Sequence, residues 1–158
     1  MRTELAEPIR DQQRLQRMLP IAEAIFQLHE AGKDYASQLE EVSRIAGRVV
    51  DIPTVLYAFG TGDAEYFARR LLTDWRNLPR DLSESEMLEL LHAVCGAKGS
   101  QDRCEYWLKC LEANTGEPEL VNLIYWPDQY RDGAYDGRDL SPEEMLEIAL
   151  RHGHRSDA

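Results

Sequence analysis

Acidic side chains are the residues of this chain best placed to do chemistry, and four of them gather in one segment after Pro127: Asp128, Asp132, Asp136 and Asp139. With Gly133 in the sixth position and Asp139 in the twelfth, the segment partly matches an EF-hand calcium loop. A calcium loop carries Asp or Asn in the third position and Glu in the twelfth, where this segment has Tyr130 and Asp139. We therefore expect a solvent-exposed acidic connection that adds to the negative charge, and not a calcium site.

Histidine and cysteine residues suggest zinc only weakly. His92 and Cys95 lie about one helical turn apart, but no second pair completes the four ligands of a structural zinc site. Cys104 and Cys110 would lie about 240° apart around a helix, so they share no face. No Ser-His-Asp order or glycine-rich phosphate loop is present. We expect no metal, no cofactor and no enzymatic activity; a small enzyme or metal-binding protein with its site in the first half is the alternative.

Two large aromatic residues, Tyr125 and Trp126, stand side by side and are followed by Pro127, which ends regular structure. Their neighbours Leu123 and Ile124 already provide apolar groups for a core. Large, stiff rings with one polar atom each are good interface anchors, because they bury much area and lose few rotamers. We expect this pair to be displayed for a partner; core filling beneath the last helix is the other interpretation.

Composition and charge restrict the kind of partner. The chain has 158 residues, with 29 acidic and 18 basic side chains and a formal net charge of −11. Such a balance argues against nucleic-acid binding and favours fast association with a basic protein. There is no apolar run long enough to span a membrane, no apolar segment typical of a secretory signal and an odd number of cysteines, three. We expect a cytoplasmic protein that has no membrane partner, no small-molecule substrate and reduced thiols.

The elements that must position these residues are all predicted to be helical. In the first half, apolar periodicity predicts helices over residues 12–30, 34–47 and 64–75. Pro20 is expected to begin a second helix or to kink the first. Residues 48–60 are β-branched at their start and fit either a short strand or a helix, of which we favour the helix.

In the second half, the pattern predicts helices over residues 84–96, 101–116 and 142–153, and a very short one within 119–126. Ser83 with Glu86 forms a capping-box pattern before the first of these helices. The break at residues 77–80 and a change in charge suggest two domains. Residues 1–79 carry a net charge of −2 and residues 80–158 carry −9.

The second half resembles the immunity proteins of colicin-class and S-type-pyocin-class DNase bacteriocins. The resemblance runs from about residue 83 to about residue 153 and rests on four landmarks in a fixed order: SESEMLELLHAVC, a second helix, NLIYWP, and an acidic loop followed by SPEEMLEIAL. Where the family has Asp and a second Tyr, this chain has Asn122 and Trp126, and its acidic loop is several residues longer. Residues 1–79 lie outside the resemblance.

This resemblance implies a four-helix domain with a short third helix that binds and inhibits a cognate nuclease toxin, of the HNH DNase type. The second helix of such proteins sets partner choice, and the third helix supplies the shared anchor. Without the resemblance, an acidic helical adaptor or regulatory protein for another basic partner is the alternative function.

The helical wheel divides the predicted second helix into two sides. Trp107, Cys110 and Leu111 lie on the side suited to the core. An apolar centre edged by carboxylates on the other side suits a cationic partner. The predicted partner-binding residues are Gln101, Cys104, Glu105, Leu108 and Glu112 for selectivity, with Asn122, Tyr125 and Trp126 from the third helix.

The first half has no assigned role in this interpretation. Its core is expected to consist of apolar residues, namely Leu15, Phe26, Leu39, Phe67, Leu71 and Trp75. Arg69 with Arg70 is expected to be a solvated basic spot. It is either a helical module that recognises another part of the toxin or a packed extension of the second half.

Overall fold

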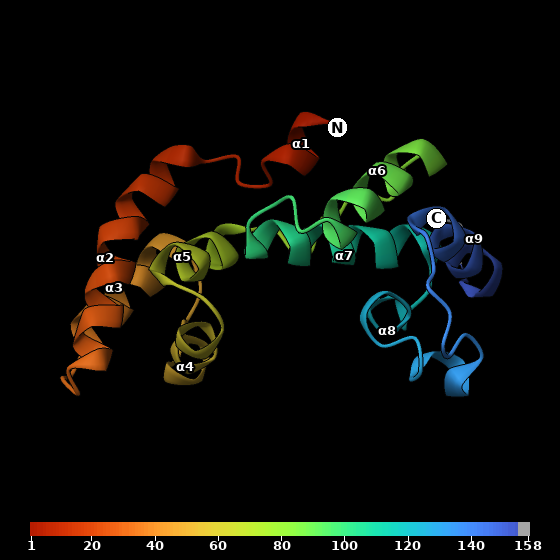
Figure 1. The fold of residues 1–158 in the computed structure, drawn as a ribbon. Helices are drawn as coiled ribbons and strands as arrows, with labels where there is room; N and C mark the ends of the chain where they lie inside the picture. Colours follow the sequence, from red (N-terminus) through yellow and green to blue (C-terminus); the bar gives the residue numbers. More distant parts are fainter. Residues whose placement is uncertain (155–158) are drawn as a thin grey trace. The chain divides into compact units, whose positions relative to one another are not determined.

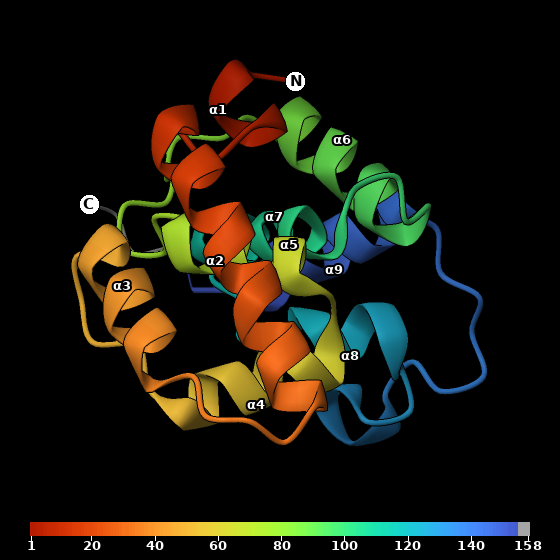
Figure 2. The same cartoon turned by 90° about the vertical axis from the view of Figure 1, so that its left-hand side faces the viewer.

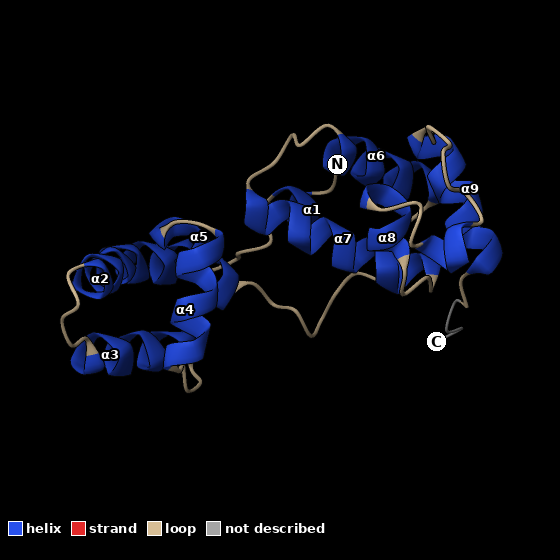
Figure 3. Cartoon of the chain, turned by 60° about the horizontal axis from the view of Figure 1, so that its bottom comes forward, coloured by secondary structure: helices blue, strands red, loops and turns tan. Residues whose placement is uncertain are grey.

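The computed structural model describes residues 1–154, and within them it contains nine α-helices, one 3-10 helix and no strand (Figures 1 and 3). The all-α prediction is confirmed. The elements are α1 (Thr3–Ala6), α2 (Gln12–Glu30), α3 (Ala36–Ala46), α4 (Ile52–Thr61), α5 (Ala64–Leu72), α6 (Glu84–Cys95), α7 (Gln101–Thr115), α8 (Leu120–Tyr125), the 3-10 helix η1 (Tyr130–Gly133) and α9 (Pro142–His152). No helix in residues 1–154 is long and apolar enough to cross a membrane.

The chain forms two compact units, and one of them is discontinuous in sequence. The C-terminal unit combines Met1–Ala6 with Trp75–Ala158, and the N-terminal unit is Glu7–Asp74. The first six residues are therefore grouped with the second half, whereas the sequence-based division placed them in a domain of residues 1–79. Whether residues 1–79 and 80–158 act as separate functional domains stays a prediction.

Four helices, α6 to α9, make up the body of the C-terminal unit, and the third of them is the short α8. The Ser83 hydroxyl and the Glu86 carboxylate form the predicted capping box at the start of α6. Gly116, in the left-handed region at φ 72°, ends α7. α6 packs against α7 and α9, and α8 contacts both α7 and α9. Their shared core holds fully buried residues from every helix and from the loop after α8, among them Met87, Leu91, Leu111, Leu123 and Tyr130.

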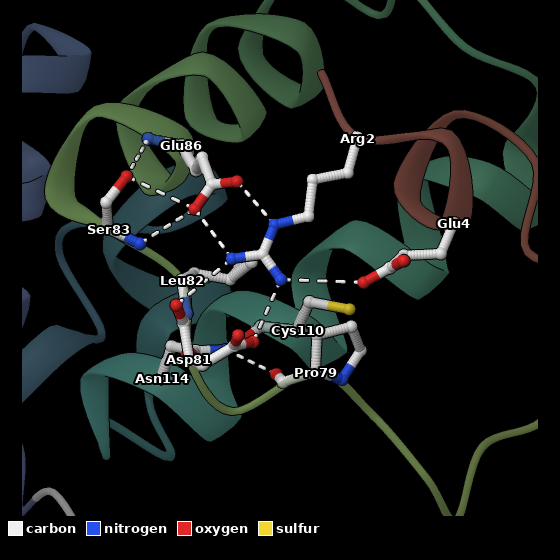
Figure 4. A network of polar contacts seen from close by, with 9 residues as sticks. All are labelled: Arg2, Glu4, Pro79, Asp81, Leu82, Ser83, Glu86, Cys110 and Asn114. Carbon is white, nitrogen blue, oxygen red and sulfur yellow. Dashed lines mark hydrogen bonds and ion pairs between the residues drawn. The ribbon is translucent and has the colours of Figure 1, made fainter.

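Helix α1 belongs to this core although it lies far away in the sequence. Leu5 is 1% exposed, and its carbonyl oxygen accepts a 2.7 Å hydrogen bond from Trp107 Nε1. Arg2 donates hydrogen bonds to the carboxylates of Glu86 and Asp81 (Figure 4). The hydrogen bonds from Arg2 and from the Ser83 backbone lower the pKa of Glu86 to about 2. The first residues thus brace the start of α6.

The N-terminal unit is a small helical bundle in which α2 packs against α3 and α5 (Figure 2). Its core includes Leu15, Phe67 and Leu71, as expected, with Phe26 and Leu39 packed against it. The expectation was wrong for Trp75, which packs against the core of the C-terminal unit. α2 runs unbroken through Pro20, so Pro20 begins no second helix. The expectation of a solvated basic spot was wrong for Arg69, which is 7% exposed and pairs with Glu7 at 2.7 Å.

Candidate functional site

Helix α8 displays the aromatic pair at the surface. Its residues Leu120 and Leu123 are fully buried, and these contacts hold the helix against the core. Tyr125 ends the helix, and Trp126 and Pro127 lead the chain away from it. Tyr125 is 47% exposed and Trp126 is 50% exposed, with ring centroids 5.8 Å apart. Leu123 therefore points inward as expected, and the two rings form a half-exposed pair.

One buried carboxylate accepts hydrogen bonds from residues on both sides of α8. Glu117, which lies before the helix and is fully buried, accepts a 3.0 Å hydrogen bond from the backbone N–H of Glu119. Its other oxygen accepts hydrogen bonds from the Tyr130 hydroxyl at 3.0 Å and from Arg131 Nη2 at 2.9 Å, both after the helix. Burial alone raises the pKa of Glu117, but these hydrogen bonds outweigh it and leave the pKa below its ordinary value. This bridge fixes the chain on either side of the aromatic pair.

The loop after α8 is only partly the solvated connection that the sequence indicates. All four of its aspartates are exposed, as expected. Tyr130, however, is fully buried and belongs to the core. Its burial gives no signal in the sequence, because the residues around it are polar and follow no helical period.

Helices α7 and α8 contact one another, and Cys104 of α7 interacts electrostatically with Tyr125 of α8. Partial burial raises the pKa of Tyr125, and the nearby thiols of Cys104 and Cys95 raise it further. Both thiols therefore lie within electrostatic range of the Tyr125 hydroxyl. Like any tyrosine near neutral pH, Tyr125 carries a neutral hydroxyl, which is able to donate a hydrogen bond to a partner.

Helix α7 has the two sides that the wheel indicates. Trp107, Cys110 and Leu111 are buried in the core. On the other side, Gln101 is exposed, and the remaining predicted residues of this helix are half-buried: Cys104, Glu105, Leu108 and Glu112. Cys104 and Leu108 also pack against the core. The carboxylate of Glu112 accepts a 2.9 Å hydrogen bond from Lys109, which partly balances its charge.

The side chains considered for a metal site have other neighbours. His92 Nε2 lies 2.8 Å from a carboxylate oxygen of Glu143. The thiol of Cys95 lies 3.9 Å from the sulfur of Met145. In the described part of the chain, no three His, Cys, Asp or Glu side chains converge closely enough to hold a metal ion.

Comparison with known families matches this unit to a family of immunity proteins. Residues 80–154, just under half of the chain, match the family described as colicin immunity protein / pyocin immunity protein. This match confirms the resemblance of the second half to that family, and residues 1–79 lie outside it. A search of curated proteins and a search of solved structures gave no significant match. The description of that family names immunity proteins of colicins and pyocins, which is the class of protein that these residues resemble.

Proposed function

We propose that this protein binds and inhibits a nuclease toxin, of the HNH DNase type, through a surface formed by α7 and α8. The Tyr125–Trp126 pair is the anchor of this surface, and Asn122 is its hydrogen-bonding neighbour. Gln101, Cys104, Glu105, Leu108 and Glu112 select the partner. The protein acts by stoichiometric binding, without catalysis and without a cofactor.

The observation that carries the proposal is the half-exposed aromatic pair. Monomeric proteins seldom place two adjacent large rings at the surface without a use for them. The segment that carries both rings is held by the buried Leu123 and, before and after α8, by the hydrogen bonds of Glu117. A rigid pair loses little conformational entropy on binding, so most of the gain from burying its rings becomes affinity.

Charge supports a nuclease as the partner. A DNA-cutting enzyme needs a cationic surface to hold the phosphate backbone. Residues 80–158 carry a net charge of −9, so they are attracted to the same surface that DNA uses. The exposed aspartates of the loop after α8 add to this negative field beside the anchor. Bound there, the protein excludes DNA by its bulk and by its charge.

We expect a gene beside this chain's own gene to encode the cognate nuclease toxin. Cleavage of plasmid DNA by that toxin tests the proposal. We expect one equivalent of the wild-type protein to stop cleavage. The variant Tyr125→Ala/Trp126→Ala should leave cleavage active, while Tyr125→Phe/Trp126→Phe, which keeps both rings, should still inhibit. Circular dichroism of each variant establishes that it is folded. A folded alanine variant that inhibits at one equivalent would refute the anchor, and an acidic adaptor for another basic partner would then be the better interpretation.

A further inference from the structure

An uncharged face of helix α4 is exposed on the N-terminal unit. Eight large apolar side chains are exposed in residues 1–154, and five of them lie between residues 49 and 59. Four of the five are on α4 and define what we call the α4 face: Ile52 (53% exposed), Leu56 (50%), Tyr57 (51%) and Phe59 (37%). Two of the remaining three form the Tyr125–Trp126 pair. The α4 face is therefore the largest gathering of exposed apolar side chains outside the proposed anchor.

The geometry of α4 indicates that a binding partner buries the α4 face. Ile52, Leu56 and Phe59 fall within an arc of about 60° on the helical wheel. Val55 and Ala58, which fall about 60° and 120° from Ile52 on the wheel, are buried in the core of the unit. No charged residue occurs from Ile52 to Thr61. A helix that is apolar on both sides is normally buried on both.

The charges at the ends of α4 indicate what kind of surface fits it. Asp51 caps α4 and Asp63 caps α5, so an exposed carboxylate stands at each end of the face. Hydrogen bonds from Thr54 hold the pKa of Asp51 below its ordinary value, which keeps this carboxylate charged. Arg70 is the cation beside the face, with its guanidinium 4.7 Å from the centroid of the Tyr57 ring. An apolar strip flanked by Lys or Arg complements this arrangement.

The size of the α4 face limits how a partner is held. A few half-exposed side chains offer roughly 500 Å², which is less than the roughly 800 Å² per partner of a stable interface. Two copies of this chain, each with a net charge of −11, would also repel one another. A contact of this size is effective when the partner is already tethered, because tethering raises its effective concentration. The C-terminal unit, joined to this one by two chain crossings, provides such a tether.

We propose that the α4 face is a second contact with the same toxin molecule. On the toxin, it binds an apolar strip flanked by basic residues. This strip is distinct from the toxin surface that the Tyr125–Trp126 pair occupies. The inference rests on the proposed function and gives the N-terminal extension its role: it strengthens a complex that the C-terminal unit begins.

The test compares two full-length variants that differ only in the polarity of this face. Ile52→Gln/Leu56→Gln makes the face polar, and the matched control Ile52→Val/Leu56→Met keeps it apolar. The probe is the complex with the toxin encoded beside this chain's gene, and the dissociation rate is measured by surface plasmon resonance. We expect the Gln variant to dissociate about tenfold faster than the wild type, and the control to dissociate like the wild type.

Each other outcome overturns the second contact. An unchanged dissociation rate means that the toxin does not touch α4. A wild-type dimer in analytical ultracentrifugation that the Gln variant dissociates assigns the face to a second copy of the chain. A lower urea midpoint for the Gln variant than for the control, by circular dichroism, assigns it to packing within the chain. If Tyr125→Ala/Trp126→Ala weakens binding and the Gln variant does not, only this inference fails; if the wild type does not bind the toxin, the proposed function fails with it.

Discussion

Replacing Tyr130 by phenylalanine removes one buried hydroxyl and leaves the ring in place. That hydroxyl donates a 3.0 Å hydrogen bond to Glu117 and accepts one of 3.1 Å from Arg131 Nε. Tyr130 and Glu117 are both fully buried, so water cannot replace the lost group. A hydrogen bond to a charged group contributes about 1.5–3 kcal/mol to stability. Because Glu117 keeps its bonds from Arg131 and Glu119, we expect Tyr130→Phe to destabilise the C-terminal unit by about 2 kcal/mol.

Urea unfolding followed by tryptophan fluorescence measures this loss. Trp75, Trp107 and Trp126 all lie in the C-terminal unit, so the signal reports that unit alone. The matched control is Tyr135→Phe: Tyr135 is only half-buried, and its hydroxyl lies at a longer distance, 3.4 Å, from His152 Nε2. We expect the control to cost less than about 0.5 kcal/mol. Equal urea midpoints for the two variants would refute the assignment of Glu117 as a buried bridge.

The same variant has a distinct pH dependence. The folded-state pKa of Glu117 is lowered, so its contribution to stability is present above the unfolded-state pKa and is lost as the pH falls through the folded-state pKa. Removing the Tyr130 hydroxyl moves the folded-state pKa upward, so Glu117 protonates at a higher pH in the variant. The gap in stability between wild type and Tyr130→Phe should be constant above about pH 5 and should narrow as the pH falls further.

Two more predictions concern the N-terminal brace. Leu5→Ala should destabilise the C-terminal unit by about 2–4 kcal/mol, because Leu5 is 1% exposed in its core; an unchanged fluorescence-detected urea midpoint would contradict the grouping of residues 1–6 with this unit. Arg2→Met should remove acid-sensitive stability, because the pKa of Glu86 near 2 depends on Arg2 first of all. The wild-type advantage should be complete above about pH 5 and should shrink toward pH 2, whereas a pH-independent difference would show that Glu86 is not the group involved.

Local patterns were sufficient to predict most of the fold. The helix over residues 12–30 was predicted with its observed bounds, since apolar periodicity there is strong. Ser83 and Glu86 form the capping box that their spacing indicates. Residues 48–60 were ambiguous because β-branched residues favour a strand. Asp51 resolves the ambiguity: its side chain accepts the Thr54 N–H and starts α4.

Contacts between residues far apart in the chain could not be predicted from the sequence. Arg2 and Glu86 are 84 positions apart, and neither residue type at its position indicates the other. The burial of Tyr130 depends on Glu117, a carboxylate that the sequence gives no reason to place inside. Arg69 is buried because it pairs with Glu7, which lies in the same unit but far away in the sequence. Each of these charged or polar groups is buried only because tertiary structure supplies its partner.

In the candidate site, too, some features could be predicted from neighbouring residues, and others depend on contacts between helices. The exposure of Tyr125 and Trp126 followed from local reasoning, since Leu123 satisfies the core and Pro127 ends the segment. A surface shared by α7 and α8 was expected only through the family resemblance, because nothing local in either segment indicates that the two helices are in contact. That these residues touch a toxin stays a prediction.

The affinity of the purified protein for the nuclease toxin encoded beside its gene tests the central claim most directly. Each aromatic anchor is expected to contribute about 2–4 kcal/mol, so Tyr125→Ala/Trp126→Ala should raise Kd by about a thousandfold or more. The ring-keeping variant Tyr125→Phe/Trp126→Phe should stay within about tenfold of the wild type. A folded alanine variant with the Kd of the wild type would contradict the claim that this pair of rings anchors the complex.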